Sequence, residues 1–168
     1  MKKTDYAPRA ADFDTYLDGK NLIGIEIGVD VGSHAEAMLT YCNIEMLYLV
    51  DVWKREYYKG YCEGRLHTKG FMHKTKMIHH DSANAAKIFA PDHKEYFDFM
   101  YFDQLHDYIS VSNDLKLWWP LLKKGGVLGY RNYAESNTDL KHAVDEFISK
   151  MGCTSSIERG EIVIFKGK

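Results

Sequence analysis

The 168-residue sequence predicts an α/β fold whose β-sheet is mostly parallel and covered by helices on both faces. Short apolar runs of strand length recur along the chain, and helical patterns separate most of them. The last two runs are joined by only three residues, 158–160, which leaves no room for a crossover helix. These observations predict five parallel strands followed by an antiparallel hairpin at one edge of the sheet.

The expected strands follow the apolar runs in chain order. They are Leu22–Ile27, Met46–Val50, Lys76–His80, Phe97–Phe102, Gly126–Tyr130, Cys153–Ile157 and Glu161–Phe165. Capping residues mark two helices. Ser33 is a natural N-cap for a helix that runs to about Cys42, and Asn137 or Thr138 caps a later helix that Gly152 closes.

The composition is that of an ordinary globular protein, with 45% hydrophobic and 27% charged residues. We expect a single domain over residues 1–168 that begins with a short helical segment over residues 1–20. The net charge of -2 gives no general attraction to nucleic acid. The sequence contains no apolar run of the roughly 20 residues that span a bilayer and no signal-like stretch at its start. With three scattered cysteines read as reduced thiols, we expect a cytoplasmic protein that binds neither nucleic acid nor membranes.

The connection over residues 54–76 differs from the rest of the chain because it holds seven Lys or Arg against two Glu, together with several aromatic residues. One interpretation is a lid or an acceptor-binding loop. The other is a solvated, partly helical connection whose aromatic side chains pack on the sheet. We favour the second.

A glycine-bearing loop follows the first strand. Glu26 lies at the strand end, and Gly28 and Gly32 precede the helix that starts near Ser33. Glycines let the backbone turn sharply and approach a ligand closely, while the amides at a helix start suit a polar or negative group. Similar turns also join strands to helices for structural reasons alone, so this pattern does not decide between the two.

Three further acids follow later strands: Asp51, Asp81 and Asp103. Asp51 lies nineteen positions beyond Gly32, where a carboxylate accepts the hydroxyl protons of a ribose and needs no other partner. Asp81 reaches the same edge and suits the amine of an adenine. Because parallel strands end on one side of the sheet, we expect these acids to converge with Glu26. Helix caps and turns are the alternative roles for Asp51 and Asp81.

The loop favours one cofactor class over another. Nicotinamide and flavin dinucleotides usually require the tighter G-x-G-x-x-G turn, which cradles a pyrophosphate. Here the loop has only Gly28 and Gly32, and the sequence has no G-x-x-x-x-G-K-[ST] motif. S-adenosylmethionine carries no phosphate, and its ammonium and sulfonium cations suit a strand edge rich in acids. An NAD-dependent oxidoreductase stays as an alternative.

Further motifs extend this pattern over nearly the whole chain from about Asn21. They are Asp51-Val52-Trp53, Phe99-Met100-Tyr101-Phe102-Asp103 with His106 and Tyr108, and Trp118-Trp119-Pro120-Leu121-Leu122-Lys123-Lys124-Gly125-Gly126-Val127-Leu128-Gly129. With these motifs the chain closely resembles the class I S-adenosylmethionine-dependent methyltransferases, and among them the small bacterial and phage O-methyltransferase-like proteins. The resemblance implies a Rossmann-like, seven-stranded, mostly parallel sheet with a C-terminal antiparallel hairpin.

The resemblance also implies a set of cofactor-binding residues. They are Glu26, Gly28, Gly32, Ser33, Asp51, Val52, Trp53, Asp81, Ser82 and Asp103. Glu26 and the two glycines would hold the methionine part, Asp51 the ribose, and Asp81 with Ser82 the adenine. Trp53 would shield the adenine ring, and Asp103 would lie beside the sulfonium.

Methyl transfer from a sulfonium is an in-line substitution, so the protein aligns donor and acceptor and removes a proton from a hydroxyl acceptor. We expect His106 and Asp103 to be the catalytic residues, because an imidazole titrates near physiological pH and the loop after the fourth strand faces the methyl donor. A surface or hydrogen-bonding role is the alternative for His106.

The presumed acceptor side departs from the family pattern. Relatives tend to have Asp-Gly-Asp-His-Ser-Tyr where this chain has residues 103–108, and Gly-His-Asp-Tyr where it has residues 130–133. Arg131, Asn132 and Tyr108 are the expected acceptor-binding residues. Some relatives hold a divalent cation here, which would give Asp103 and Asn132 as ligands with Asp107 as a further candidate. Because Asn132 and Arg131 reduce the negative charge, we favour a site without metal.

The function that these observations favour is S-adenosylmethionine-dependent O-methylation of a small-molecule or sugar acceptor. A protein that has kept cofactor binding but lost turnover is a second alternative, because the acceptor side is altered. Only about twenty residues precede the first strand, which gives little cap over the acceptor. A homodimer that supplies the missing wall is therefore a further hypothesis.

Overall fold

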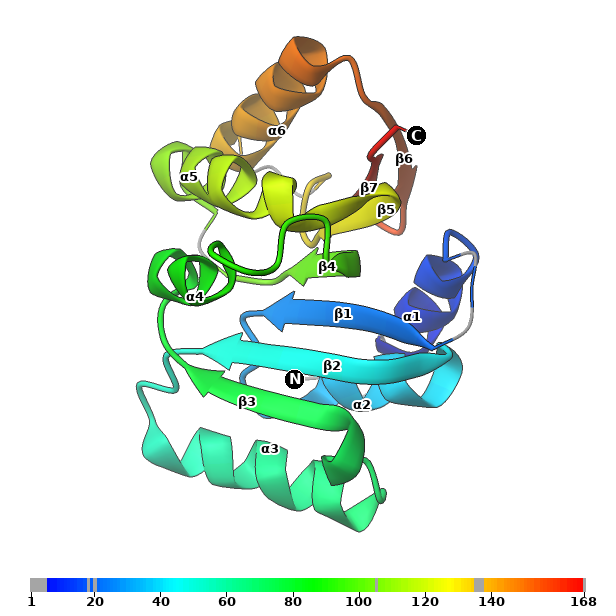
Figure 1. Ribbon diagram of the computed structural model, residues 1–168, viewed down its shortest axis with the longest axis vertical. Coiled ribbons are helices and arrows are strands. Elements are labelled where there is room, and N and C mark those ends of the chain that lie inside the picture. The colour runs from blue at the N-terminus through cyan, green and yellow to red at the C-terminus, as the bar shows by residue number, and fades with distance from the viewer. Residues whose placement is uncertain (1–5, 18, 20, 105, 135–137, 168) are drawn as a thin grey trace.

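A computed structural model describes residues 6–17, 19, 21–104, 106–134 and 138–167 (Figure 1). The strands of this part of the chain are β1 (Leu22–Ile27), β2 (Ile44–Asp51), β3 (Thr75–His79), β4 (Phe97–Phe102), β5 (Leu122–Tyr130), β6 (Thr154–Glu158) and β7 (Glu161–Phe165). The helices are α1 (Tyr6–Asp14), α2 (Ser33–Tyr41), α3 (Glu56–Thr68), α4 (Ser82–Phe89), α5 (Tyr108–Trp118) and α6 (Thr138–Met151), with short 3-10 helices η1 (Met72–Lys74) and η2 (Trp119–Leu121).

All these strands form one sheet in the order β3-β2-β1-β4-β5-β7-β6. Strands β1 to β5 pair in parallel, while β7 pairs antiparallel with both β5 and β6. The predicted fold class is therefore confirmed. In Figure 1 the arrowheads of β1, β2 and β3 point to the same edge of the sheet. The strand order reverses between β1 and β4, and a ligand crevice in open α/β sheets forms outside the carboxyl ends at such a point.

Several element boundaries differ from the predicted ones. Strand β5 begins at Leu122 and not at Gly126, because Leu122 already pairs with Phe97 before the register shifts. Ser33 is not the N-cap of α2. The cap position is Gly32, whose φ of 72° lies in the left-handed region, and the helix begins at Ser33. Asn137 lies outside the described residues, whereas Gly152 ends α6 with a φ of 64° as expected.

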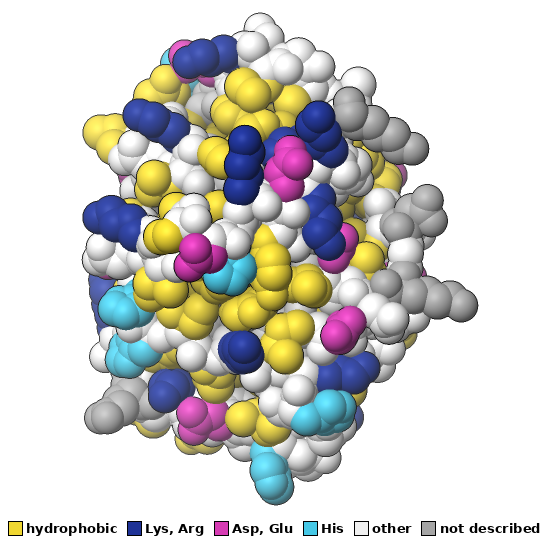
Figure 2. All heavy atoms as spheres, in the orientation of Figure 1, with side chains coloured by type: hydrophobic (Ala, Val, Ile, Leu, Met, Phe, Trp, Pro, Cys, Tyr) yellow, Lys and Arg dark blue, Asp and Glu magenta, His cyan; other side chains and the backbone are white. Residues whose placement is uncertain are grey.

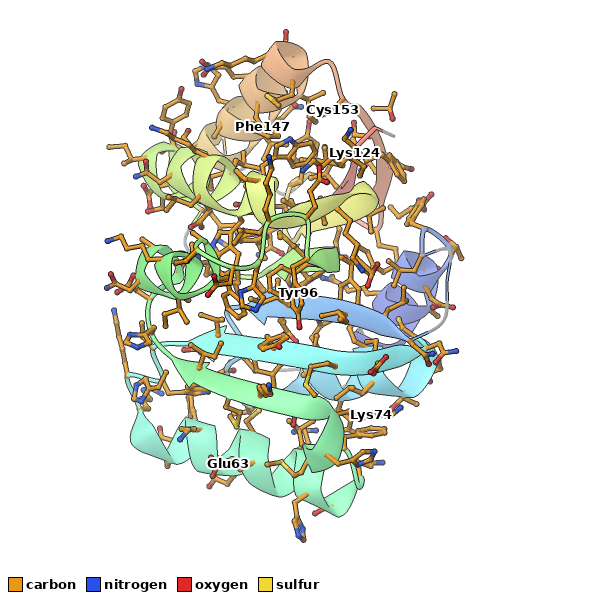
Figure 3. All side chains as sticks on the ribbon, viewed as in Figure 1. Glu63, Lys74, Tyr96, Lys124, Phe147 and Cys153 are labelled. Atoms are coloured by element: carbon orange, nitrogen blue, oxygen red, sulfur yellow. The ribbon has the colours of Figure 1, made fainter. Side chains whose placement is uncertain are left out.

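Two hydrophobic clusters fill the two faces of the sheet. Helices α4, α5 and α6 pack over one face, and α1, α2 and α3 over the other. Successive residues of β2 alternate between the clusters, with Leu47 and Leu49 in one and Tyr48 and Val50 in the other. Phe147 on α6 and Tyr96, both labelled in Figure 3, pack at the margin of the first cluster. The central strands are thus buried on both faces, and the carboxyl ends of the parallel strands remain for binding.

The 54–76 connection agrees in part with the favoured interpretation. It is helical over α3, and Phe71 packs at the margin of the core, as in the favoured interpretation. Tyr57 and Tyr61 are instead 56% and 63% exposed.

On the face drawn in Figure 2, basic and acidic side chains are interspersed. None of the described helices has the length and apolar character needed to cross a membrane.

Candidate functional site

A cavity of about 700 Å³ opens at the carboxyl edge of the sheet. Its walls are the ends of the parallel strands and the loops that follow them. The lining residues are Glu26, Gly28, Val29, Asp30, Val31, Ser33, His34, Val50, Asp51, Val52, Trp53, Lys54, Arg55, Tyr58, His80, Asp81, Asp103, Gln104 and Arg131. The four acids that were expected to converge are all among them.

The glycines of the first loop are required by close backbone approach. A Cβ atom on Gly28 would lie 2.1 Å from the carbonyl oxygen of Asp103, and its φ is 90°. A Cβ on Gly32 would lie 2.5 Å from Sγ of the buried Cys62. Only glycine fits either position. Gly28 opens the floor of the cavity, whereas Gly32 packs behind the loop and does not line it.

Asp51 holds the shape of the same loop. Its Oδ2 accepts hydrogen bonds from the backbone amides of Val29 and Asp30, both at 2.8 Å, and its Oδ1 accepts one from the amide of Trp53 at 2.7 Å. The expectation that this acid has no other partner was therefore wrong. A carboxylate offers about four acceptor positions. Three backbone amides still leave Asp51 able to accept one hydroxyl proton at the cavity.

Glu26 is the most deeply buried acid of the cavity, with 2% of its surface exposed. Its Oε1 lies 3.3 Å from Nδ1 of His34, and its Oε2 has no hydrogen-bond partner among the described residues. Burial raises the pKa of this carboxyl above its usual range. His34 is also buried, and its ring stacks on Tyr101 with centroids 4.0 Å apart. The buried Oε2 lacks a cationic or donor partner that a ligand can supply.

His34 was missed by the sequence analysis. It is the second residue of α2, directly behind the glycine loop, and this position at a helix start beside the cavity was the available signal. It is one of eight histidines, and no motif distinguished it from the others.

The far end of the cavity carries an aromatic wall. Trp53 is buried with a φ of 33°, and its Nε1 donates to the carbonyl oxygen of Asp30 at 2.9 Å. His79 packs edge-on against Trp53 and bonds the Val52 carbonyl. Asp81 caps α4 by accepting from the amide of Asn84, and this bond lowers the pKa of Asp81. Asp81 thus has the capping role considered for it and also lines the cavity.

The opposite end of the cavity is built around Asp103. Its Oδ2 accepts from Nη1 of Arg131 at 2.5 Å. Next to it, Gln104 donates from Nε2 to Oδ2 of Asp114, also at 2.5 Å. Asp114 is 4% exposed, and burial raises its pKa to about 6. A buried carboxylate on α5 therefore holds a side chain of the cavity wall, and sequence patterns gave no sign of this pairing.

A comparison with known protein families shows which family this chain belongs to. The family model described as a methyltransferase domain matches residues 25–133, which is more than half of the chain. The chain belongs to this methyltransferase family. The matched range begins within β1, includes β2 to β5 and contains every residue that lines the cavity. No curated protein matches the sequence.

Solved structures resemble this methyltransferase domain in fold. A protein from Corynebacterium glutamicum has a TM-score of 0.78 at 14% identity and covers 96% of this chain and 80% of its own. A putative caffeoyl-CoA O-methyltransferase from Staphylococcus aureus has a TM-score of 0.75 at 15% identity, with 96% and 82% covered. An S-adenosylmethionine-dependent O-methyltransferase from Thermotoga maritima has a TM-score of 0.69 at 14% identity, and the match covers 100% of this chain and 68% of that protein. At these identities the likeness establishes the fold.

Some predicted site residues do not reach the cavity of the methyltransferase domain. Ser82 is buried, donates to Asp114 at 2.5 Å and accepts from Nε1 of Trp118 at 2.8 Å. Tyr108 donates to Glu146 and borders a separate groove between α5 and α6. His106 and Asn132 are not among the lining residues either. The side chains of Tyr108 and Ser82 thus have partners outside the cavity, and their binding roles stay predictions.

Two of the residues expected at a metal position have other partners. Asp103 is ion-paired with Arg131, while Asp107 caps α5 by accepting from the amide of Ser110 at 3.0 Å. Within the described ranges, no three His, Cys, Asp or Glu side chains are grouped so that they could hold a metal ion. The side chains present do not fit a carboxylate-held divalent cation.

Proposed function

We propose that this methyltransferase domain transfers the methyl group of S-adenosylmethionine to an oxygen atom of a small-molecule acceptor. The observation that carries the proposal is the buried Oε2 of Glu26, which lacks a partner among the described residues and lies in a cavity with Gly28 and Asp51. An amino acid ammonium would complete the hydrogen bonding of this carboxylate. Family membership supports the same activity.

The residues of the cavity fit the parts of the cofactor in order. Glu26 would take the ammonium of the methionine part over the open backbone at Gly28, and the remaining acceptor position of Asp51 would take a ribose hydroxyl. Trp53 and Asp81 would border the adenine. When bound, S-adenosylmethionine supplies a methyl group on a cationic sulfur.

The end of the cavity at Asp103 would hold the acceptor. A methyl transfer needs the acceptor oxygen in line with the donor and, for a hydroxyl, a group that takes its proton. Asp103 and Gln104 line this end and are fixed by Arg131 and Asp114. We propose that these two side chains orient the acceptor. That His106, three residues after Asp103, takes the proton stays a prediction.

The test compares two buried glutamates by calorimetric titration with S-adenosylhomocysteine. Glu26→Gln keeps the shape of the side chain but removes its charge. Since a hydrogen bond to a charged group contributes about 1.5–3 kcal/mol, affinity should fall by roughly 10- to 150-fold. Glu161→Gln is the matched control, because Glu161 is buried but does not line the cavity. Equal affinity of wild type and Glu26→Gln would refute the placement.

Turnover needs a separate assay, since binding alone also fits a protein that has lost catalysis. Purified protein is incubated with S-adenosylmethionine labelled in its methyl group and a set of hydroxylated small molecules. Label in an extracted product supports the proposal. Tight binding of S-adenosylhomocysteine with no transfer to any of them would favour the alternative of a binding protein.

A further inference from the structure

We propose that the guanidinium of Arg131, paired with Asp103, supplies the positive charge at the acceptor end of the cavity, so that this site works without a divalent cation. One solved structure of similar fold, the MycE methyltransferase, is described in complex with Mg and S-adenosylhomocysteine, with a TM-score of 0.68 at 15% identity. The inference concerns the acceptor end of the cavity and rests on the proposed function only for the reaction that follows.

The contact between Arg131 and Asp103 carries the inference. Nη1 of Arg131 lies 2.5 Å from Oδ2 of Asp103, and both side chains line the cavity. The backbone fixes both residues, because the amide of Asp103 donates to Ile27 at 2.8 Å and the amide of Arg131 donates to Phe102 at 3.1 Å. The ion pair is therefore held by β1, β4 and β5 at the strand ends.

Two of the three residues expected to bind a cation have another role in this structure. Asp103 is paired with Arg131, and Asp107 is an exposed N-cap of α5. Asn132 is neutral and does not line the cavity. Magnesium requires several oxygen ligands in near-octahedral geometry and is repelled by a fixed positive charge. A guanidinium also carries a planar set of donors that suits carboxylate oxygens.

This arrangement has a consequence for the reaction. The positive charge beside the acceptor is part of the chain and does not exchange with solvent. An acceptor oxygen that becomes negative as it loses its proton would be stabilised by Arg131. Methyl transfer should then be insensitive to chelators, and the acceptor class is a small molecule with an ionisable hydroxyl.

The test measures Mn²⁺ binding by electron paramagnetic resonance, without cofactor or acceptor. Wild type should show weak binding only, and Arg131→Asp should bind one Mn²⁺ at least tenfold more tightly. Adding Asp103→Asn to Arg131→Asp should remove that gain. The matched control is Lys123→Asp, since Lys123 pairs with Asp98 at 2.7 Å on the same two strands but at their starts, the end marked by Lys124 in Figure 3.

Tight Mn²⁺ binding by wild type that Asp103→Asn abolishes would overturn the inference. An equal gain in Arg131→Asp and Lys123→Asp would overturn it too, since any new acid beside an acid would then suffice. If Arg131→Asp fails to fold, Arg131→Asn replaces it, with a smaller but measurable gain expected. Titration of the same samples with S-adenosylhomocysteine tests the proposed function separately, because that binding does not depend on Mn²⁺.

Discussion

Gly28 and Asp51 are the residues for which sequence reasoning came closest to the structure. Gly28 was expected to let the backbone approach a ligand closely, and the structure shows a close approach of its backbone to the carbonyl of Asp103. Asp51 was placed at the correct strand end, but its three amide partners could not be seen because they depend on how the loop folds back. For that reason Asp51→Ala would disturb the loop as well as the site. Glu26→Gln is the cleaner substitution.

Asp114 shows what a sequence pattern hides. It lies on α5, and the sequence shows it only as one of several polar residues of a predicted helix. In the structure it accepts hydrogen bonds from Ser82 and Gln104 and connects the buried Trp118 to the cavity wall. Such a network forms only when α4, α5 and the loop after β4 pack together, so no local pattern announces it.

The buried carboxyl of Asp114 predicts a pH effect on stability. Its pKa is about 6 in the folded protein against an ordinary value of 3.8, so the folded state binds the proton more tightly. The free energy of unfolding should therefore rise as the pH falls from about 7 to 5 and level off below pH 4. The contribution is about 1 kcal/mol over that interval.

Urea denaturation of wild type and Asp114→Asn at pH 5 and pH 7 measures this effect. The variant cannot titrate at this position and should lack the gain at the lower pH. Other groups that titrate in the same range cancel in the difference between the two proteins. If the free energies of unfolding of wild type and Asp114→Asn differ by the same amount at both pH values, the raised pKa is contradicted.

At the scale of elements, the strands were predictable because burial on both faces produces continuous apolar runs. Strands β1, β4 and β7 have the predicted bounds. The starts of β2 and β5 were missed because Ile44 and Glu45, and then Leu122 to Gly125, mix polar and apolar residues. Tyr108 was predicted to bind the acceptor, yet this first residue of α5 donates to Glu146 of α6. The direction of a side chain at a helix start depends on how the helices pack.

Helix α1 is attached to the sheet by two arginine pairs of different burial, which gives a prediction for this element. Arg9 donates to Glu161 at 2.8 Å, and Glu161 also accepts from the buried Tyr101 at 2.6 Å. Arg9→Met leaves the buried Glu161 without its cation and should lower the free energy of unfolding by about 3 kcal/mol. The control is Arg159→Met, since the pair of Arg159 with Asp12 is largely exposed.

Urea denaturation of both variants at pH 7 makes the comparison. The exposed pair of Arg159 is expected to contribute less than about 1 kcal/mol. Similar losses in the two variants would mean that burial of Glu161 does not decide how α1 is held. A lower free energy of unfolding for Arg159→Met alone would mean that the exposed pair with Asp12, and not the buried pair of Arg9 with Glu161, holds α1 on the sheet.

At the scale of the whole molecule, the fold brings the ends of the parallel strands to one cavity, and the charges there differ from one end to the other. At the proposed cofactor end lies a buried Glu26 oxygen that has no hydrogen-bond partner within the described part of the chain. The proposed acceptor end holds an acid, Asp103, that is paired with Arg131. The convergence of acids followed from topology and was predictable. The ion pair of Asp103 with Arg131 could not be predicted, because it depends on the positions of both side chains in the fold.

The most direct measurement is calorimetric titration of the wild-type protein with S-adenosylhomocysteine, run beside NAD under the same conditions. We expect one site of micromolar affinity for S-adenosylhomocysteine and no saturable heat with NAD, because the cavity offers acids to the cofactor and lacks the G-x-G-x-x-G turn that holds a pyrophosphate. Saturable binding of NAD without binding of S-adenosylhomocysteine would contradict the proposed function and leave only the fold established.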